Sequence, residues 1–157
     1  MLKMGLLKRT GSNIRLVEGQ ALTSSSIETI YIPLVGTVTC SVPLLATENI
    51  EAFVPVSTKI AKSGLNYFLL WASGDSMNEA GIDDWNILLV KQQNSADDGQ
   101  KVVALINDEA TVKVLERRGT TTILRPKSSN KKHKPIILTA NCQIQGVVVA
   151  ILPSDLN

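Results

Sequence analysis

Residues 101–125 have the sequence KVVALINDEATVKVLERRGTTTILR, and this run carries the main signal for the architecture. Its three apolar stretches are rich in Val, Ile, Leu and Thr, the composition of β-strands. The apolar stretches are Val102–Ile106, Thr111–Leu115 and Thr121–Leu124. Short polar segments of the kind found in hairpin turns, Asn107-Asp108-Glu109 and Arg118-Gly119, separate them. The run therefore predicts antiparallel strands joined by hairpins.

Similar segments recur from Tyr31 onward. Strands are predicted at residues 31–38, 66–72, 86–92, 101–107, 109–117, 120–125, 135–139 and 143–152. Leu44–Ile50 and Met77–Ala80 could each form a short turn of helix. The pattern predicts a mostly-β domain of twisted sheets folded on one core.

Length and composition narrow the class of protein. A chain of 157 residues fits one domain with a short appendage, and its 16 basic and 14 acidic residues do not by themselves indicate a nucleic-acid binder. Two cysteines, Cys40 and Cys142, are too few for a disulfide framework and suit a reducing cytoplasm. No apolar run approaches the roughly 20 residues of a membrane span, and the amino terminus is too polar for a signal peptide. We expect a soluble, cytoplasmic protein.

Two polar segments stand apart from the strands. Residues 1–17 contain two short apolar stretches around Gly11-Ser12, and residues 18–30, with Thr23-Ser24-Ser25-Ser26, have the composition of a flexible linker. The basic run Lys131-Lys132-His133-Lys134 lies between two apolar stretches. It is interpreted as a solvated hairpin loop in preference to a functional patch.

Ser76, in Ser73-Gly74-Asp75-Ser76-Met77, precedes Lys113 by 37 residues. A serine hydroxyl attacks a carbonyl when a neighbouring base removes its proton, and a neutral lysine can be that base. Lowering a lysine pKa from about 10.4 to near 7 requires roughly 4–5 kcal/mol, which burial can supply. Strand alternation places Lys113 on the face of Thr111 and Leu115. Taken alone, however, the serine is more typical of a turn and the lysine of an exposed edge strand.

Residues 32–45, IPLVGTVTCSVPLL, add a third motif upstream of this pair. Together with Gly81-Ile82-Asp83 and the run Gly99–Ala104, the order and spacing resemble the LexA repressor family, over roughly residues 31–152. The C-terminal domain of that family cuts its own chain with a Ser–Lys dyad. The resemblance implies a mostly-β, twisted multi-strand peptidase domain of the LexA and signal-peptidase type.

The resemblance also implies roles for individual residues. Ser76 would be the nucleophile, Lys113 the general base, and the backbone amides of Asp75 and Ser76 the oxyanion hole. No metal or cofactor is implied. The carboxylate of Asp75 is expected to point away from Lys113, because its charge would favour the ammonium form.

By position, the scissile bond is predicted between Cys40 and Ser41, two residues before Pro43. Serine after the cut departs from the family's usual glycine, and its Cβ could crowd the cleavage turn. The other interpretation of Cys40 is a small buried hydrophobic residue. A second departure is Trp85, in Asp84-Trp85-Asn86, where the family often has Asp-Gly-Asp; a bulky residue there would suit an interface.

The predicted function is that of a LexA-type SOS repressor with the remnant wing of a winged helix-turn-helix (1–17), a linker (18–30) and a self-cleaving, dimerising domain (31–157). By resemblance, a filament of RecA on single-stranded DNA favours cleavage. The cut separates the dimer from the DNA-binding part and so abolishes bivalent binding to operator DNA. The helices of a complete DNA-binding domain cannot fit ahead of residue 5, so the chain either begins inside that domain or is naturally short.

Two other functions compete with this one. A UmuD-like protein is a self-cleaving accessory subunit of an error-prone polymerase, and chain length and Cys40 favour it. The wing-like segment and Pro33-Leu34-Val35-Gly36 favour the repressor. A membrane-bound signal peptidase with the same dyad is disfavoured because no membrane anchor is evident.

The apolar run at the carboxyl terminus bears on assembly. Residues 144 and 147–152 are more apolar than one core face requires. By resemblance, this strand is expected at the interface of a homodimer, where pairing would cover an exposed edge. A buried central strand fits the same periodicity.

Overall fold

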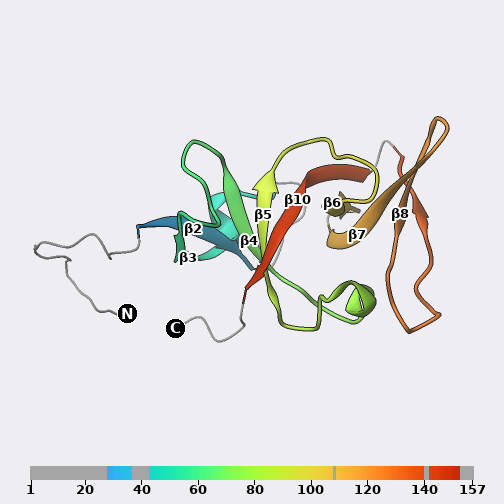
Figure 1. The fold of residues 1–157 in the computed structure, drawn as a ribbon, viewed down its shortest axis with the longest axis horizontal. Coiled ribbons are helices and arrows are strands. Elements are labelled where there is room, and N and C mark those ends of the chain that lie inside the picture. Colours follow the sequence, from blue (N-terminus) through green and yellow to red (C-terminus); the bar gives the residue numbers. More distant parts are fainter. Residues whose placement is uncertain (1–27, 37–42, 108, 140–141, 153–157) are drawn as a thin grey trace, which may run out of the picture.

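A computed structural model describes residues 28–36, 43–107, 109–139 and 142–152, and within them a single sheet of nine strands dominates (Figure 1). The order across the sheet is β3-β2-β4-β5-β10-β6-β7-β8-β9. Neighbouring strands run antiparallel, except for β2 and β4, which are parallel. The strands are β2 Thr29–Val35, β3 Ile50–Ser57, β4 Tyr67–Trp71, β5 Ile87–Gln92, β6 Lys101–Ile106, β7 Glu109–Arg118, β8 Thr121–Arg125, β9 Ile136–Ile137 and β10 Cys142–Leu152. Two short 3-10 helices, η1 Thr47–Asn49 and η2 Asn78–Ala80, complete the described elements.

The mostly-β fold class is confirmed, and each predicted strand has a counterpart. The hairpins that join β6 to β7 and β7 to β8 are present, with Gly119 in the left-handed region at φ 61°. The two predicted helical turns correspond to η1 and η2. β2 starts at Thr29, inside the predicted linker.

One strand was missed. β3 pairs with β2 along its whole length but contains Pro55, which argues against a strand when only the sequence is read. Because β3 lies at the edge of the sheet, the missing N–H of Pro55 leaves no central ladder incomplete.

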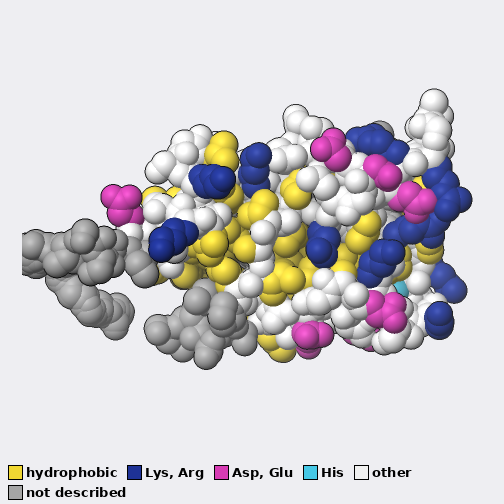
Figure 2. Space-filling view, in the orientation of Figure 1, with side chains coloured by type: hydrophobic (Ala, Val, Ile, Leu, Met, Phe, Trp, Pro, Cys, Tyr) yellow, Lys and Arg dark blue, Asp and Glu magenta, His cyan; other side chains and the backbone are white. Residues whose placement is uncertain are grey.

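Three clusters of buried residues form the core along the two faces of the sheet. The central strands β4 and β5 are buried on both faces, which explains their uninterrupted apolar sequences, YFLLW and ILLV. Gly146 marks a close approach of β10 to β5: an added Cβ would lie 2.4 Å from the carbonyl oxygen of Lys91. Figure 2 shows hydrophobic side chains along the middle of the molecule, with Lys and Arg gathered over the β7–β9 end.

The expectation that the carboxyl-terminal strand lies at an exposed edge is wrong. β10 pairs with β5 on one side and β6 on the other, so it is a central strand. It is not fully buried either, because Val149 and Ile151 are 47% and 40% exposed. Any contact between copies through this strand would therefore use its face.

Some predictions fall outside the described residues. These are the wing at 1–17, the linker as far as residue 27, and the Cys40–Ser41 bond. Among the residues that are described, no helix has the length and apolar character needed to cross a membrane.

Candidate active site

Ser76 lies in an irregular segment between β4 and η2. Its sequence explains the irregularity, because Gly74 adopts φ 83°, a conformation that favours glycine. The Gly74 N–H donates to Asp84 Oδ1 at 2.9 Å. The side chain of Met77 is buried in the core beside β4 and β5. These contacts hold the segment on both sides of a half-buried Ser76.

Lys113 lies in the middle of β7, opposite Val102 of β6. The residue is only 7% exposed, and Asn49 is the other buried polar or charged residue among those described. The predicted alternation holds: Leu115 packs in one core cluster, while Ala110, Val112 and Val114 pack against another. Lys113 is therefore a buried lysine on a strand whose register the hairpin fixes.

The two residues meet. Lys113 Nζ lies 3.2 Å from Ser76 Oγ, and it donates hydrogen bonds to Thr111 Oγ1 at 2.8 Å and to the Val112 carbonyl oxygen at 3.2 Å. A neutral amine has two N–H groups and one lone pair. If Thr111 and Val112 take the two N–H groups, the lone pair is left for the hydroxyl of Ser76.

Burial lowers the pKa of Lys113 from its ordinary value of 10.5, because the charged ammonium loses its hydration. The negative charge of Glu109 opposes this by raising the pKa of Lys113, but burial is the larger cause. The pKa of Lys113 is therefore lowered overall, so its amine becomes neutral at a lower pH than that of an ordinary lysine.

The carboxylate of Asp75 binds two residues of the loop between β8 and β9, and Lys113 is not among its partners in the described part of the chain. His133 Nε2 lies 2.6 Å from Asp75 Oδ1, and Asn130 Nδ2 donates to Asp75 Oδ2 at 3.2 Å. These two hydrogen bonds, first His133 and then Asn130, hold the pKa of Asp75 below its usual value. The Asp75 carboxylate is thus held by hydrogen bonds from the loop between β8 and β9.

A narrow groove of about 140 Å³ opens over Ser76. Residues of β4, of the segments on either side of η2 and of β7 line it: Leu70, Trp71, Ala72, Ser73, Ser76, Met77, Ile82, Glu109, Ala110, Thr111 and Val112. The N–H of Ser76 donates no hydrogen bond within the described part of the chain, so it is available to an oxyanion. A carbonyl group that enters this groove would lie near Ser76.

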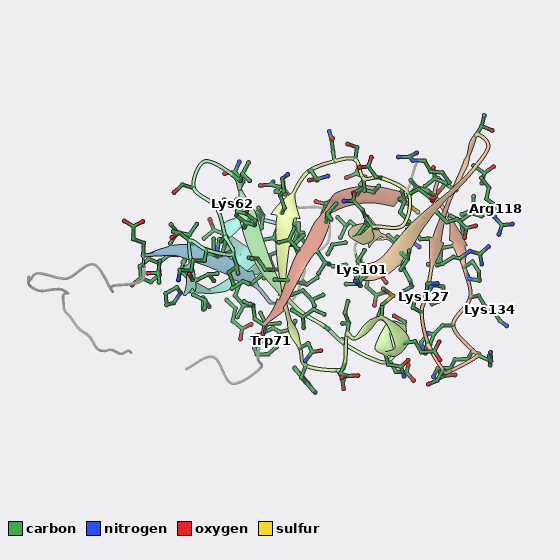
Figure 3. All side chains as sticks on the ribbon, viewed as in Figure 1. Lys62, Trp71, Lys101, Arg118, Lys127 and Lys134 are labelled. Atoms are coloured by element: carbon green, nitrogen blue, oxygen red, sulfur yellow. The ribbon has the colours of Figure 1, made fainter. Side chains whose placement is uncertain are left out.

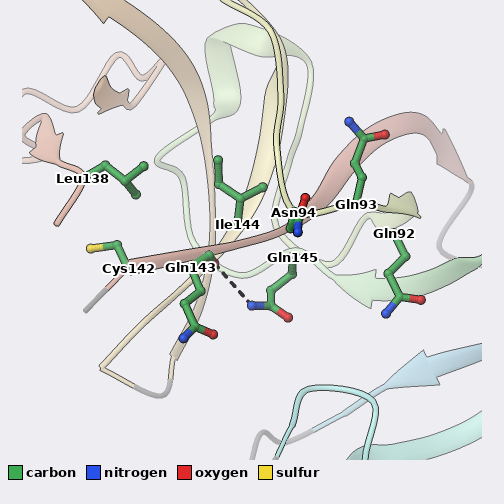
Figure 4. Close-up of a pocket in the computed structure, with 8 residues that line it drawn as sticks. All are labelled: Gln92, Gln93, Asn94, Leu138, Cys142, Gln143, Ile144 and Gln145. Atoms are coloured by element: carbon green, nitrogen blue, oxygen red, sulfur yellow. Dashed lines mark hydrogen bonds between the residues drawn. The ribbon is translucent and has the colours of Figure 1, made fainter. Parts of the chain in front are cut away.

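A larger hollow, of about 700 Å³, lies elsewhere (Figure 4). Five carboxamide side chains from residues 92–94, 143 and 145 line it with Leu138, Cys142 and Ile144. None of the predicted catalytic residues borders it. Size alone therefore does not identify the reactive site.

Trp85 contacts Trp71, one of the residues that line the small groove. It is 65% exposed, has φ 69°, and contacts Trp71 edge to face with ring centroids 6.0 Å apart. A tryptophan in the left-handed region is strained, which accounts for glycine being the more usual residue at such a turn.

Comparison with known proteins shows the family of this chain. The Peptidase S24-like family matches residues 33–149. The chain belongs to this family. Among its S24-like relatives, a LexA repressor of Clostridium botulinum (strain Langeland) is 42% identical over 149 residues, which are 95% of this chain and 72% of that protein. A LexA repressor of Clostridium perfringens (strain SM101) is 40% identical over the same shares. The chain is therefore a LexA-type, S24-like protein, as predicted.

Sequence reasoning missed part of this S24-like site. Asn130 and His133 follow Asp75 by 55 and 58 residues, in a run that resembles an ordinary solvated loop. The hairpin-loop interpretation is correct for the exposed Lys131, Lys132 and Lys134, but His133 is half-buried. No local pattern indicates which residue of a loop turns inward.

Proposed function

We propose that this protein is a LexA-type SOS repressor that cuts its own Cys40–Ser41 bond with Ser76 and Lys113. The observation that carries the proposal is the 3.2 Å approach of Lys113 Nζ to Ser76 Oγ, at a lysine that is buried. Membership of the S24-like family supports it.

The chemistry follows from the two groups. Neutral Lys113 takes the proton of Ser76, and Oγ attacks the carbonyl carbon of Cys40. Amides of Asp75 and Ser76 would bind the oxyanion. As the tetrahedral intermediate collapses, the Lys113 ammonium protonates the departing nitrogen of Ser41. Lys113 then deprotonates a water molecule that hydrolyses the Cys40 ester and restores Ser76.

The biological setting is part of the proposal. The protein would act as a homodimer in the bacterial cytoplasm and bind operator DNA through a full winged helix-turn-helix. A RecA filament on single-stranded DNA would trigger the cut. The LexA repressors among its relatives favour this function over a UmuD-like polymerase subunit.

The test is self-cleavage of the purified chain. After incubation at pH 7 and at alkaline pH, mass spectrometry should find two fragments that meet between Cys40 and Ser41. Ser76→Ala and Lys113→Ala should each abolish the cut while circular dichroism stays unchanged. Cleavage that survives in either folded variant would exclude the dyad.

A further inference from the structure

The loop between β8 and β9, residues 126–135, is hydrogen-bonded to the segment that carries Ser76. Two backbone hydrogen bonds join them: Lys127 N–H donates to the Ser76 carbonyl at 2.9 Å, and Glu79 N–H donates to the Lys127 carbonyl at 2.8 Å. In Figure 1 this loop runs beside η2, and Figure 3 labels Lys127 and Lys134 along it. The loop thus contacts the nucleophile residue itself.

Side-chain hydrogen bonds also join this loop to residues on both sides of Ser76. Asn78 and Ser129 exchange two hydrogen bonds, each 3.1 Å long. On the other side, Asp75 accepts from His133 at 2.6 Å and from Asn130 at 3.2 Å. Because Asp75 and Ser76 share a peptide unit, a force that holds the Asp75 side chain also restrains the position of Ser76.

The loop is organised to make these contacts. Asn130 N–H donates to Ser128 Oγ at 3.0 Å, and Asn130 Oδ1 accepts from Lys132 N–H at 3.1 Å. The carboxamide of Asn130 is thereby oriented with its nitrogen toward Asp75. The segment that carries Ser76 contains Gly74 in a left-handed conformation and has little regular structure. Its position therefore depends on the contacts that the loop makes with it.

We propose that His133 is a positioning residue for self-cleavage, which acts through Asp75, with help from Asn130, to keep Ser76 Oγ within reach of Lys113 Nζ. This inference rests on the proposed function of Ser76 and Lys113. The separation of 3.2 Å leaves little margin, and a displacement of about 1 Å can reduce a rate by roughly 100-fold. The contact also keeps the Asp75 charge directed toward the loop.

The experiment compares His133→Leu with His133→Gln. Glutamine can place an N–H donor near the position of Nε2, whereas leucine has a similar size and no donor. Self-cleavage of the full chain is followed as a first-order rate across pH. His133→Leu should lower the plateau rate by about 10-fold without moving the pH midpoint, and His133→Gln should stay within about threefold of the wild type.

A double-mutant cycle tests the route through Asp75. Asp75→Ala should slow cleavage at least as much as His133→Leu, because it removes the acceptor of both His133 and Asn130. The double variant should be no slower than Asp75→Ala, because the contact that His133→Leu breaks is already lost in it. Lys131→Ala, an exposed change in the same loop, is the matched control and should cleave at the wild-type rate. Thermal unfolding confirms that each variant is folded.

The opposite results are equally clear. The positioning role would be overturned if His133→Leu cleaved at the wild-type rate, or if glutamine and leucine slowed cleavage equally. It would also be overturned if the losses of the two single variants multiplied in the double variant. A pH midpoint that moves while the plateau rate is retained would do the same. Cleavage that survives in Ser76→Ala would instead overturn the proposed function, so the two failures can be told apart.

Discussion

Lys113 Nζ and Ser76 Oγ lie 3.2 Å apart, although Lys113 follows Ser76 by 37 positions in the chain. β7 supplies the lysine from within the sheet, and the segment after β4 supplies the serine from its surface. Neither group would form a reactive site alone. Together they form a nucleophile and a base at hydrogen-bond distance, with Thr111 orienting the amine.

The first prediction concerns the pH dependence of cleavage. Burial lowers the pKa of Lys113, so its neutral fraction grows as pH rises through that lowered value. We expect the first-order rate to increase with pH and to reach half its maximum below pH 10.5, the ordinary pKa of lysine. Densitometry of fragments from pH 5 to pH 11 measures this. A rate that falls with rising pH would contradict a lysine base.

The second prediction concerns stability. A lysine whose pKa is lowered by folding destabilises the native state at neutral pH, because the unfolded chain binds the proton more tightly. The cost is complete below the lowered pKa and disappears as pH rises from that value to about 10.5. Lys113→Met should therefore raise the free energy of unfolding at pH 7 by roughly 0.5–2 kcal/mol.

Urea unfolding at pH 7 and at pH 10 measures this effect. The gain from Lys113→Met should shrink at the higher pH, where the wild-type lysine is closer to neutral. Lys101→Met, at a half-buried lysine on the neighbouring strand β6, is the control for the added methionine. Lower stability of Lys113→Met at pH 7 would show that the hydrogen bonds of Lys113 outweigh its burial cost.

The third prediction concerns the cut site. Ser41→Gly should accelerate cleavage several-fold, because glycine widens the allowed backbone conformations and removes a side chain beside the attacking hydroxyl. The measurement is the cleavage rate at the pH plateau, with Val42→Ala as a nearby control that keeps a Cβ. An unchanged or lower rate in Ser41→Gly would mean that the serine is accommodated without cost.

The fourth prediction concerns assembly. We expect a dimer in sedimentation velocity at micromolar concentration, with the exposed face of β10 as the contact. The double variant Val149→Glu and Ile151→Glu should sediment as a folded monomer, because it places two charges in an apolar interface. Ile137→Glu, at an equally apolar exposed position on β9, should remain dimeric. A monomeric wild type would remove the dimer and its avidity for DNA.

Much of the fold could be predicted because strand formation depends on local composition and on alternation. The chain order of the strands follows from their apolar composition, and the hairpin at Gly119 follows from its turn residues. The face shared by Thr111, Lys113 and Leu115 follows from period-two patterning. The proposed dyad could also be named, since its two motifs are short and retain their spacing. By itself, then, the sequence determined the fold class, the candidate residues and the side of the strand on which the lysine lies.

The tertiary structure decided what depends on partners distant in the chain. β3 forms despite Pro55 because it lies at the edge, and β10 is central because both β5 and β6 pair with it. His133 belongs to the site because a loop of ordinary polar composition folds back on Asp75. Periodicity reports only neighbours along the chain, whereas strand order, the burial of Lys113 and the contact between His133 and Asp75 depend on how the whole sheet closes around the site.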